Sequence, residues 1–171
     1  MALIKLNLAQ GVTGTLPTSN YVSPDNSPSF IATRSGNLAL SDNSLTTVVF
    51  NSEVFDSDSK YDTSTGRFTP TVAGKYFLYF QCVLETGAND NNLEFVEGTI
   101  YKNTSSYSKC FYDFRSDTDG RTFTVQGNAI MDMNTTDYAE VRVLLNSVTS
   151  GDNKVAGGSH ESYFGGYKII T

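Results

Sequence analysis

Residues 61–80 read YDTSTGRFTPTVAGKYFLYF, and this stretch decides the fold. A polar turn at its start leads into a run that is apolar at nearly every position. In an extended strand, Tyr76 and every second residue after it share one face, while Phe77 and Tyr79 share the other. Antiparallel sheets usually leave one face in water. A strand that is aromatic on both faces therefore predicts a second covering layer.

The composition around this strand is typical of an all-β protein. The chain has 171 residues, with ten Tyr, eleven Phe and no Trp. Aromatic and β-branched residues favour strands, and the abundant Gly, Ser, Asn and Asp favour turns. This length favours one main domain, and no amphipathic helix of useful length is evident.

Short β-like runs recur from Pro28 onward, with turn signals such as Asp119-Gly120 between them. Many short antiparallel strands predict a jelly-roll β-sandwich. We predict strands over Ser29–Thr33, Thr46–Phe50, Arg67–Pro70, Gly74–Leu84, Leu93–Lys102, Tyr107–Phe114, Thr122–Met133, Tyr138–Leu145 and Tyr163–Ile170.

The last of these strands repeats the aromatic pattern on both faces. An exposed row of aromatic side chains promotes association, because burying each side chain stabilises by a few kcal/mol. Two such strands predict a homo-oligomer. The residues expected in its interface or in the core are Tyr76, Phe77, Tyr79, Phe80, Tyr163, Phe164 and Tyr167.

The first 27 residues differ from the rest of the chain. Ile4, Leu6 and Leu8 alternate with more polar residues, and a segment rich in turn formers follows. Two interpretations are open: a tail without fixed structure, or an arm that becomes ordered on a partner. The start also lacks the continuous apolar core of a secretory signal, so we expect synthesis in a cytoplasm without export by that route.

Charge and hydropathy argue against two classes of partner. The net charge is −6 and the pI about 4.6, whereas proteins that track nucleic-acid phosphates are basic somewhere. No apolar run approaches the about 20 residues of a spanning helix. We therefore expect neither nucleic-acid binding nor membrane insertion.

Residues that could carry chemistry are few. The only histidine, His160, lies outside any catalytic motif, so we expect no enzyme activity and no catalytic residue. Cys82 and Cys110 each lie in an apolar run, and they are either buried hydrophobes or one disulfide. Oxygen-rich loops at 85–97, 113–119 and 149–153 leave calcium open, but none has EF-hand spacing, so no metal ligand is assigned.

One further group of residues has two interpretations. Tyr107, Tyr112 and Phe114, together with Arg115, lie in or beside one expected strand. They form either a patch that binds a sugar or a protein, or part of the core and the subunit interface.

Eight positions resemble, in order and spacing, the signature of the complement C1q globular head: Phe50, Asp56, Tyr61, Phe68, Gly74, Tyr76, Leu78 and Phe80. That family has Phe where Leu78 stands here. The resemblance extends over residues 28–171 and implies the ten-strand jelly roll shared with tumour necrosis factor. It also implies a compact homotrimer in which aromatic residues line the three-fold axis, which would cover the second face. No collagen-like Gly-x-y stalk is present.

A shorter resemblance concerns Ala9–Pro17, which looks like phrases common in bacteriophage tail-fibre and virion proteins. Together the two resemblances imply a viral structural protein: a homotrimeric knob, residues 28–171, on a tail fibre or capsid. The arm, residues 1–27, would bind other virion proteins. The head would bind a host-surface glycan or protein, or only decorate the capsid, and the protein would lie on the virion surface. A bacterial surface or secreted lectin-like adhesin is the alternative.

Overall fold

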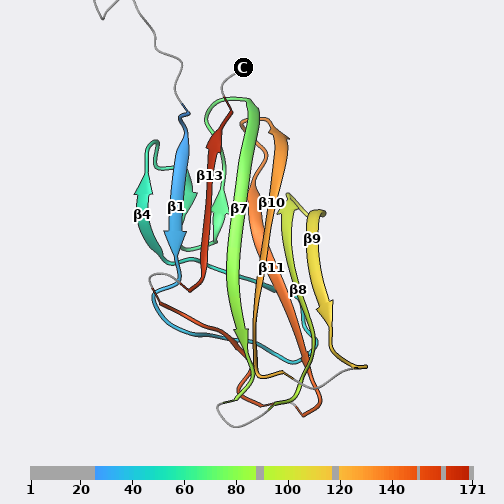
Figure 1. Cartoon of the computed structure of the whole chain (residues 1–171). Coiled ribbons are helices and arrows are strands. Elements are labelled where there is room, and N and C mark those ends of the chain that lie inside the picture. Colours follow the sequence, from blue (N-terminus) through green and yellow to red (C-terminus); the bar gives the residue numbers. More distant parts are fainter. Residues whose placement is uncertain (1–25, 88–90, 117–119, 150, 159–160, 170–171) are drawn as a thin grey trace, which may run out of the picture.

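The computed structural model describes residues 26–87, 91–116, 120–149, 151–158 and 161–169. Every element in these residues is a β-strand, and the strands form two antiparallel sheets. The two sheets make the layers of one sandwich (Figure 1). Among the described residues there is no helix long and apolar enough to cross a membrane. The predicted all-β jelly roll is confirmed.

One sheet has seven strands and the other six. The seven-stranded sheet contains β1 (Ser29–Thr33), β2 (Leu38–Ala39), β4 (Ser52–Asp56), β7 (Gly74–Glu85), β10 (Thr122–Met133), β12 (Lys154–Val155) and β13 (Tyr163–Lys168). The six-stranded sheet contains β3 (Thr46–Thr47), β5 (Tyr61–Asp62), β6 (Arg67–Phe68), β8 (Leu93–Lys102), β9 (Ser105–Asp113) and β11 (Ala139–Ser147).

Strand β7, the apolar run of the opening stretch, is central to its sheet. Along one side it pairs with β10 over its full length. Along the other side it pairs first with β13 and then with β12. Beyond β13 lie β1 and then β4, which forms that edge of the sheet. The side chains on the two faces of β7 therefore lie at the middle of the two sides of this sheet.

The longer strands agree with their predicted bounds to within two residues at each described end. The prediction of one strand over Thr46–Phe50 is wrong, because only Thr46–Thr47 pair in the six-stranded sheet. The chain then crosses to the other sheet, with Val48 and Phe50 fully buried at the crossing. There it forms β4, which was not predicted; nor were the two-residue strands β2, β5 and β12.

The core between the sheets is aromatic at the end near the start of β1. The ring centroids of Phe30 and Phe68 are 4.4 Å apart and stacked, and Phe164 meets Phe30 edge-on at 5.0 Å. All three rings are buried. Such arrangements stabilise by about 0.5–1.5 kcal/mol per pair beyond the area that they bury. Three strands far apart in sequence are thereby fixed together.

The polar turn at the start of residues 61–80 is stabilised by hydrogen bonds among its own residues. The Asp62 carboxylate accepts hydrogen bonds from the Ser64 backbone N–H at 2.8 Å and from the Thr65 hydroxyl at 2.8 Å. These bonds lower the pKa of Asp62 to about 2. Gly66 has φ +76°, and a Cβ there would lie 2.8 Å from the Val48 carbonyl oxygen. Glycine is therefore required where β5 turns back into β6.

Candidate functional site

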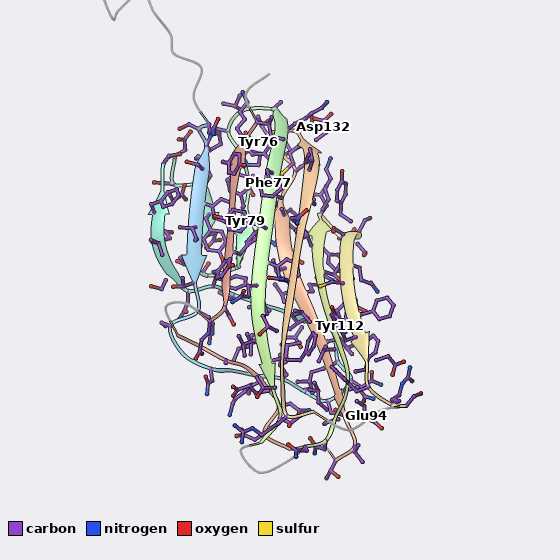
Figure 2. All side chains as sticks on the ribbon, viewed as in Figure 1. Tyr76, Phe77, Tyr79, Glu94, Tyr112 and Asp132 are labelled. Carbon is purple, nitrogen blue, oxygen red and sulfur yellow. The ribbon has the colours of Figure 1, made fainter. Side chains whose placement is uncertain are left out.

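The alternation of β7 separates its aromatic residues into two sets, as the pattern predicts. Tyr76, Leu78 and Phe80 point into the core and are buried. Phe77 and Tyr79 are only partly buried and lie on the outside of the seven-stranded sheet. In Figure 2 both are labelled along the upper part of β7. The second face of the opening strand is thus the outer surface of the sandwich.

Strand β13 adds two tyrosines to that surface. The rings of Phe77 and Tyr167 are 5.5 Å apart, and those of Tyr79 and Tyr163 are 6.1 Å apart. Phe77 and Tyr79 are themselves 6.0 Å apart. We call the continuous surface of Phe77, Tyr79, Tyr163 and Tyr167 the aromatic face. Phe164 and Phe80, from the same predicted set, lie in the core instead.

Phe80 fills a space that two glycines leave inside the sandwich. A Cβ at Gly98 would lie 2.7 Å from Phe80 Cε2, and one at Gly127 would lie 2.8 Å from Phe80 Cε1. Larger residues at either glycine would displace the ring. The role of Phe80 in this structure is therefore packing.

Neighbouring strands extend the aromatic face with aliphatic and aromatic side chains that sequence reasoning missed. Ile130 of β10 pairs with Phe77, and Ile31 of β1 pairs with Phe55 of β4. Ile130 is 59% exposed and Phe55 51% exposed. The alternation within Ser29–Thr33 could have indicated Ile31, but β4 gave no comparable signal.

A pit opens beside the tyrosines of the aromatic face. Its volume is about 360 Å³ and it is lined by Tyr79, Phe80, Gln126, Gly127, Asn128 and Tyr163. Tyrosine, Gln126 and Asn128 side chains make its lining polar, and desolvation by burial raises the pKa of Tyr79. The pit therefore offers hydroxyl and carboxamide groups inside an otherwise apolar surface.

The outside of the six-stranded sheet is more polar, although Phe111 is exposed there and stacks on Phe95 with ring centroids 5.8 Å apart. Glu140, only 1% exposed, accepts a hydrogen bond from Arg67 Nε at 2.9 Å and another from Arg142 Nε at 2.7 Å. The two guanidinium groups also lie over tyrosine rings, Arg67 over Tyr138 at 4.0 Å and Arg142 over Tyr101 at 4.2 Å. Charges satisfied in this way suit a surface that faces water.

Residues of β8 and β9 cover the free edge of β10. Tyr107 Oη donates to the Ile130 carbonyl and Ser108 Oγ to the Asn128 carbonyl, both at 2.9 Å. Lys102 Nζ donates to the Asp132 carbonyl at 2.6 Å. Side chains thus occupy carbonyls that another strand would otherwise bind.

The predicted group of Tyr107, Tyr112, Phe114 and Arg115 does not form one patch. Tyr107 bonds to β10, and Arg115 pairs with Asp113. Tyr112 and Phe114 instead cluster around Phe123, with ring centroids 4.3 and 5.2 Å from it. Tyr112 is 53% exposed, so this cluster gives the β9–β10 edge an aromatic surface.

Both cysteines are free, so the structure favours the interpretation as buried hydrophobes over the disulfide. Cys82 is fully buried, and Cys110 is half-buried, with its thiol 3.4 Å from the Gly98 carbonyl oxygen. Burial raises the pKa of both thiols.

Other predicted residues lie outside the described part of the chain. These are Ile4, Leu6 and Leu8 of the arm, together with His160. Among the described residues, no three His, Cys, Asp or Glu side chains come together as a metal site would require. The oxygen-rich loops are described only in part.

Three comparisons place this geometry among known proteins. The model of the C1q domain matches residues 29–169. A comparison with curated proteins gave no match. Solved structures do match, and they show the fold.

The globular domain of zebrafish complement 1qA protein superposes with a TM-score of 0.58 at 16% identity, covering 83% of this chain and 97% of that one. Murine APRIL at pH 5.0 superposes with a TM-score of 0.58 at 12% identity, and the match covers 82% of this chain and 99% of that one. Eiger TNF from S. frugiperda superposes with a TM-score of 0.57 at 14% identity, and the match covers 82% of this chain and 91% of that one.

Domains of this family are typically binding or structural domains, and they generally form trimeric globular heads. The family-model match covers most of the chain and coincides with the sandwich described above. The chain belongs to the C1q domain family.

Proposed function

We propose that this protein is a non-catalytic, homotrimeric head, and that the aromatic face is its contact between copies. The observation that carries the proposal is the difference between the two outer faces of the sandwich. One presents the four rings of Phe77, Tyr79, Tyr163 and Tyr167, and the other presents paired charges beside a single exposed aromatic pair, Phe95 and Phe111. Large exposed apolar patches mark interaction sites.

The energy of burial favours this use of the aromatic face. Tyr167 is 38% exposed and Ile130 59% exposed in the single chain. Fully burying a large apolar side chain stabilises by about 1.5–3 kcal/mol. Several such residues lie together, so covering them offsets a substantial part of the free-energy cost of association.

A three-fold arrangement needs two different contact surfaces. If the aromatic face met only itself, the contact would be isologous and would give a dimer. The β9–β10 edge, with Tyr112 against Phe123, is a second apolar surface on the same molecule. Contact of one copy's aromatic face with the next copy's edge is heterologous, and it closes into a ring of three if each copy is rotated by one third of a turn from the last.

We further propose that this trimer is a knob on the surface of a bacteriophage virion. The support is the resemblance of Ala9–Pro17 to tail-fibre and virion sequences. In this proposal residues 1–27 attach the knob to other virion proteins on a tail fibre or capsid. The trimer either binds a host-surface molecule or decorates the capsid.

The topology is compatible with such an arm. Strand β1 begins and β13 ends at the same end of the sandwich, because Ser29 pairs with Tyr167 (Figure 1). An arm that precedes β1 leaves from that end. Strands β7 and β9 both end at the opposite end of the sandwich, and we propose that this end contacts the ligand (Figure 1).

Sedimentation of the full chain tests the trimer. We expect a particle of three times the 18.7 kDa chain mass. Replacing Phe77 and Tyr167 together by Ser should give a folded monomer, whereas Phe111→Ser should remain trimeric. Phe111 is 58% exposed on the outer side of the six-stranded sheet, so it is a matched control. A monomeric or dimeric wild-type protein would contradict the proposal.

Imaging the parent particles with an antibody to the head tests the location. Signal on the tail or on the capsid is the expected result. Particles without signal would contradict the virion proposal, and signal on a bacterial envelope would support the adhesin instead. Neither of these two outcomes bears on the proposal that the protein is a trimer.

A further inference from the structure

Two phenylalanines form an aromatic pair on the outer side of the six-stranded sheet. The rings of Phe95, from β8, and Phe111, from β9, stack with their centroids 5.8 Å apart. Phe111 is 58% exposed and Phe95 is partly exposed. Phe111 and Tyr112 are consecutive in β9, so their side chains point to opposite sides of that strand. Tyr112 belongs to the cluster around Phe123, so the pair lies outside both surfaces of the proposed trimer contact.

Strand register holds the two rings on a regular part of the sheet. Phe95 lies between Asn146 of β11 and Asp113 of β9, and Phe111 lies opposite Glu97 of β8. Rings carried by paired strands are already ordered before a ligand arrives. Such preorganisation lowers the entropy cost of binding.

Charged groups beside the rings are paired with one another. Lys109 Nζ donates to Glu97 Oε2 at 2.9 Å, and Arg115 pairs with Asp113. Glu97 is itself only 8% exposed. These pairs leave no surplus of positive charge next to the rings, so nothing here favours an anionic ligand.

The rim of the aromatic pair retains groups that can bond to hydroxyls. Lys109 has three N–H groups and a side chain that is 46% exposed, and it uses one N–H for Glu97. Asn146 Nδ2 donates to Glu94 Oε2 at 2.8 Å, and the Asn146 carboxamide oxygen accepts no hydrogen bond from the described residues. Glu94 adds a negative charge, which disfavours anions further. A hydroxyl both donates and accepts, so it matches a rim of this kind.

The apolar area of the pair is too small for a protein partner. A specific protein–protein contact buries about 800 Å² on each side, whereas a whole aromatic side chain buries about 150–250 Å². A wholly apolar small molecule, in turn, needs a pocket that covers most of its surface. Two stacked rings on the outer side of a sheet contact a ligand from one side only.

We infer that Phe95 and Phe111 form a binding platform for a neutral saccharide. One face of a pyranose ring consists of C–H groups, which pack on the negative face of an aromatic ring. The hydroxyls around the sugar ring bond to Lys109 and Asn146. Three copies in the proposed trimer present three platforms, which raises avidity for a glycan-covered surface.

This inference deepens the proposed function, on which it rests for the orientation of the head. Phe95 follows directly on Glu94, which Figure 2 labels at the end of the sandwich opposite to the start of β1. That is the end assigned above to the ligand. The saccharide platform gives that assignment a ligand class and two aromatic residues.

Saturation-transfer NMR on the full chain tests the inference. The probes are two neutral disaccharides, lactose and cellobiose, together with mannitol and cyclohexanol. We expect at least one disaccharide to receive saturation, mainly at the C–H groups on one face of a pyranose ring. Mannitol has hydroxyls without a rigid apolar face, and cyclohexanol has the apolar ring with one hydroxyl. Each should therefore bind at least about tenfold more weakly.

Variants at Phe111 separate the aromatic contact from other effects. Phe111→Ser should weaken disaccharide binding at least about tenfold, and Phe111→Tyr, which keeps the ring, should retain it. Val72→Ser is the matched control, because Val72 is 45% exposed and precedes β7 at the other end of the sandwich. Asn146→Ala should weaken binding about threefold to tenfold. Sedimentation of each variant checks that it is still assembled like the wild type.

Several results would overturn the inference. One is the absence of saturation transfer to both disaccharides. Equal binding of mannitol would show that the aromatic contact is not needed, and equal binding of cyclohexanol would show that the hydroxyls are not. Wild-type binding by Phe111→Ser would place the site elsewhere. A monomeric wild-type chain that binds a disaccharide would refute only the trimer, and a trimer that binds neither would refute only this inference.

Discussion

The phenol ring of Tyr79 lies directly over Gly165 of the neighbouring strand. The two residues pair across β7 and β13. A Cβ at Gly165 would be 2.7 Å from both Tyr79 Cζ and Oη, and 3.1 Å from the Phe30 carbonyl oxygen. The tyrosine is therefore flat against the sheet only because position 165 has no side chain.

Gly165→Ala should displace the Tyr79 ring and weaken association of the chain. Overpacking of this kind costs about 1–3 kcal/mol, and the ring can move outward, so we expect the fold to survive. Sedimentation equilibrium and thermal unfolding measure the two effects. Gly36→Ala is the matched control, since a Cβ there has nothing within 4 Å. If the two variants associate equally well, the Tyr79–Gly165 contact is not needed for assembly.

Phe30→Ala should lower the free energy of unfolding by about 3–5 kcal/mol. Phe30 is 1% exposed and contacts rings from three other segments, among them Phe68 and Phe164. Removing it leaves a cavity that rings held by different strands cannot easily fill. Urea unfolding at one fixed protein concentration measures the change.

Phe111→Ala is the control for that experiment, because its ring is 58% exposed. Substitutions of exposed residues usually change the free energy of unfolding by less than about 0.5 kcal/mol. Comparable losses in the two variants would mean that the aromatic cluster around Phe30 is not the main source of stability at that end.

The sequence allowed most of the fold to be predicted, because its long strands are strongly patterned. Alternation in β7 correctly separates Tyr76 from Phe77, but it cannot say which of them faces the core, since both sides are aromatic. That choice depends on Phe30, Phe68 and Phe164, which come from distant strands. It is a tertiary property.

The extent of the candidate contact surface was less predictable. Phe55 lies on β4, whose only strand partner among the described residues is β1 and whose residues show no clear alternation. The close packing of Tyr79 on Gly165 depends on strand register, which a single strand's sequence does not contain.

Stability should fall as the pH is lowered from about 4 toward about 2, in part because of Asp137. Its carboxylate accepts hydrogen bonds from the Asn134 N–H and the Asn103 side chain, both at 2.8 Å, and lies 3.1 Å from Lys102 Nζ. These contacts lower its pKa from 3.8 to about 2. A lowered pKa contributes stability above the unfolded-state value, and that stability is lost as the pH falls through the folded-state value.

Urea unfolding between pH 6 and pH 2 measures this dependence. Asp137→Asn should be less stable than the wild type at pH 6 and should lose less stability on acidification. Asp152→Asn, which removes a carboxylate whose side chain is 76% exposed, is the control and should follow the wild-type curve. An Asp137→Asn curve parallel to the wild type would contradict the assignment.

The two thiols should differ in reactivity toward an aromatic disulfide reagent at pH 8. Attack requires the thiolate, and burial raises the pKa of both groups. Cys82 is 0% exposed and should not react in the folded protein, whereas the half-buried Cys110 should react slowly. Unfolding in urea should release two thiols per chain. In folded Cys110→Ser the slow reaction should disappear, and in folded Cys82→Ser it should persist. Fewer than two thiols after unfolding without reductant would reveal a disulfide and contradict the free cysteines seen here.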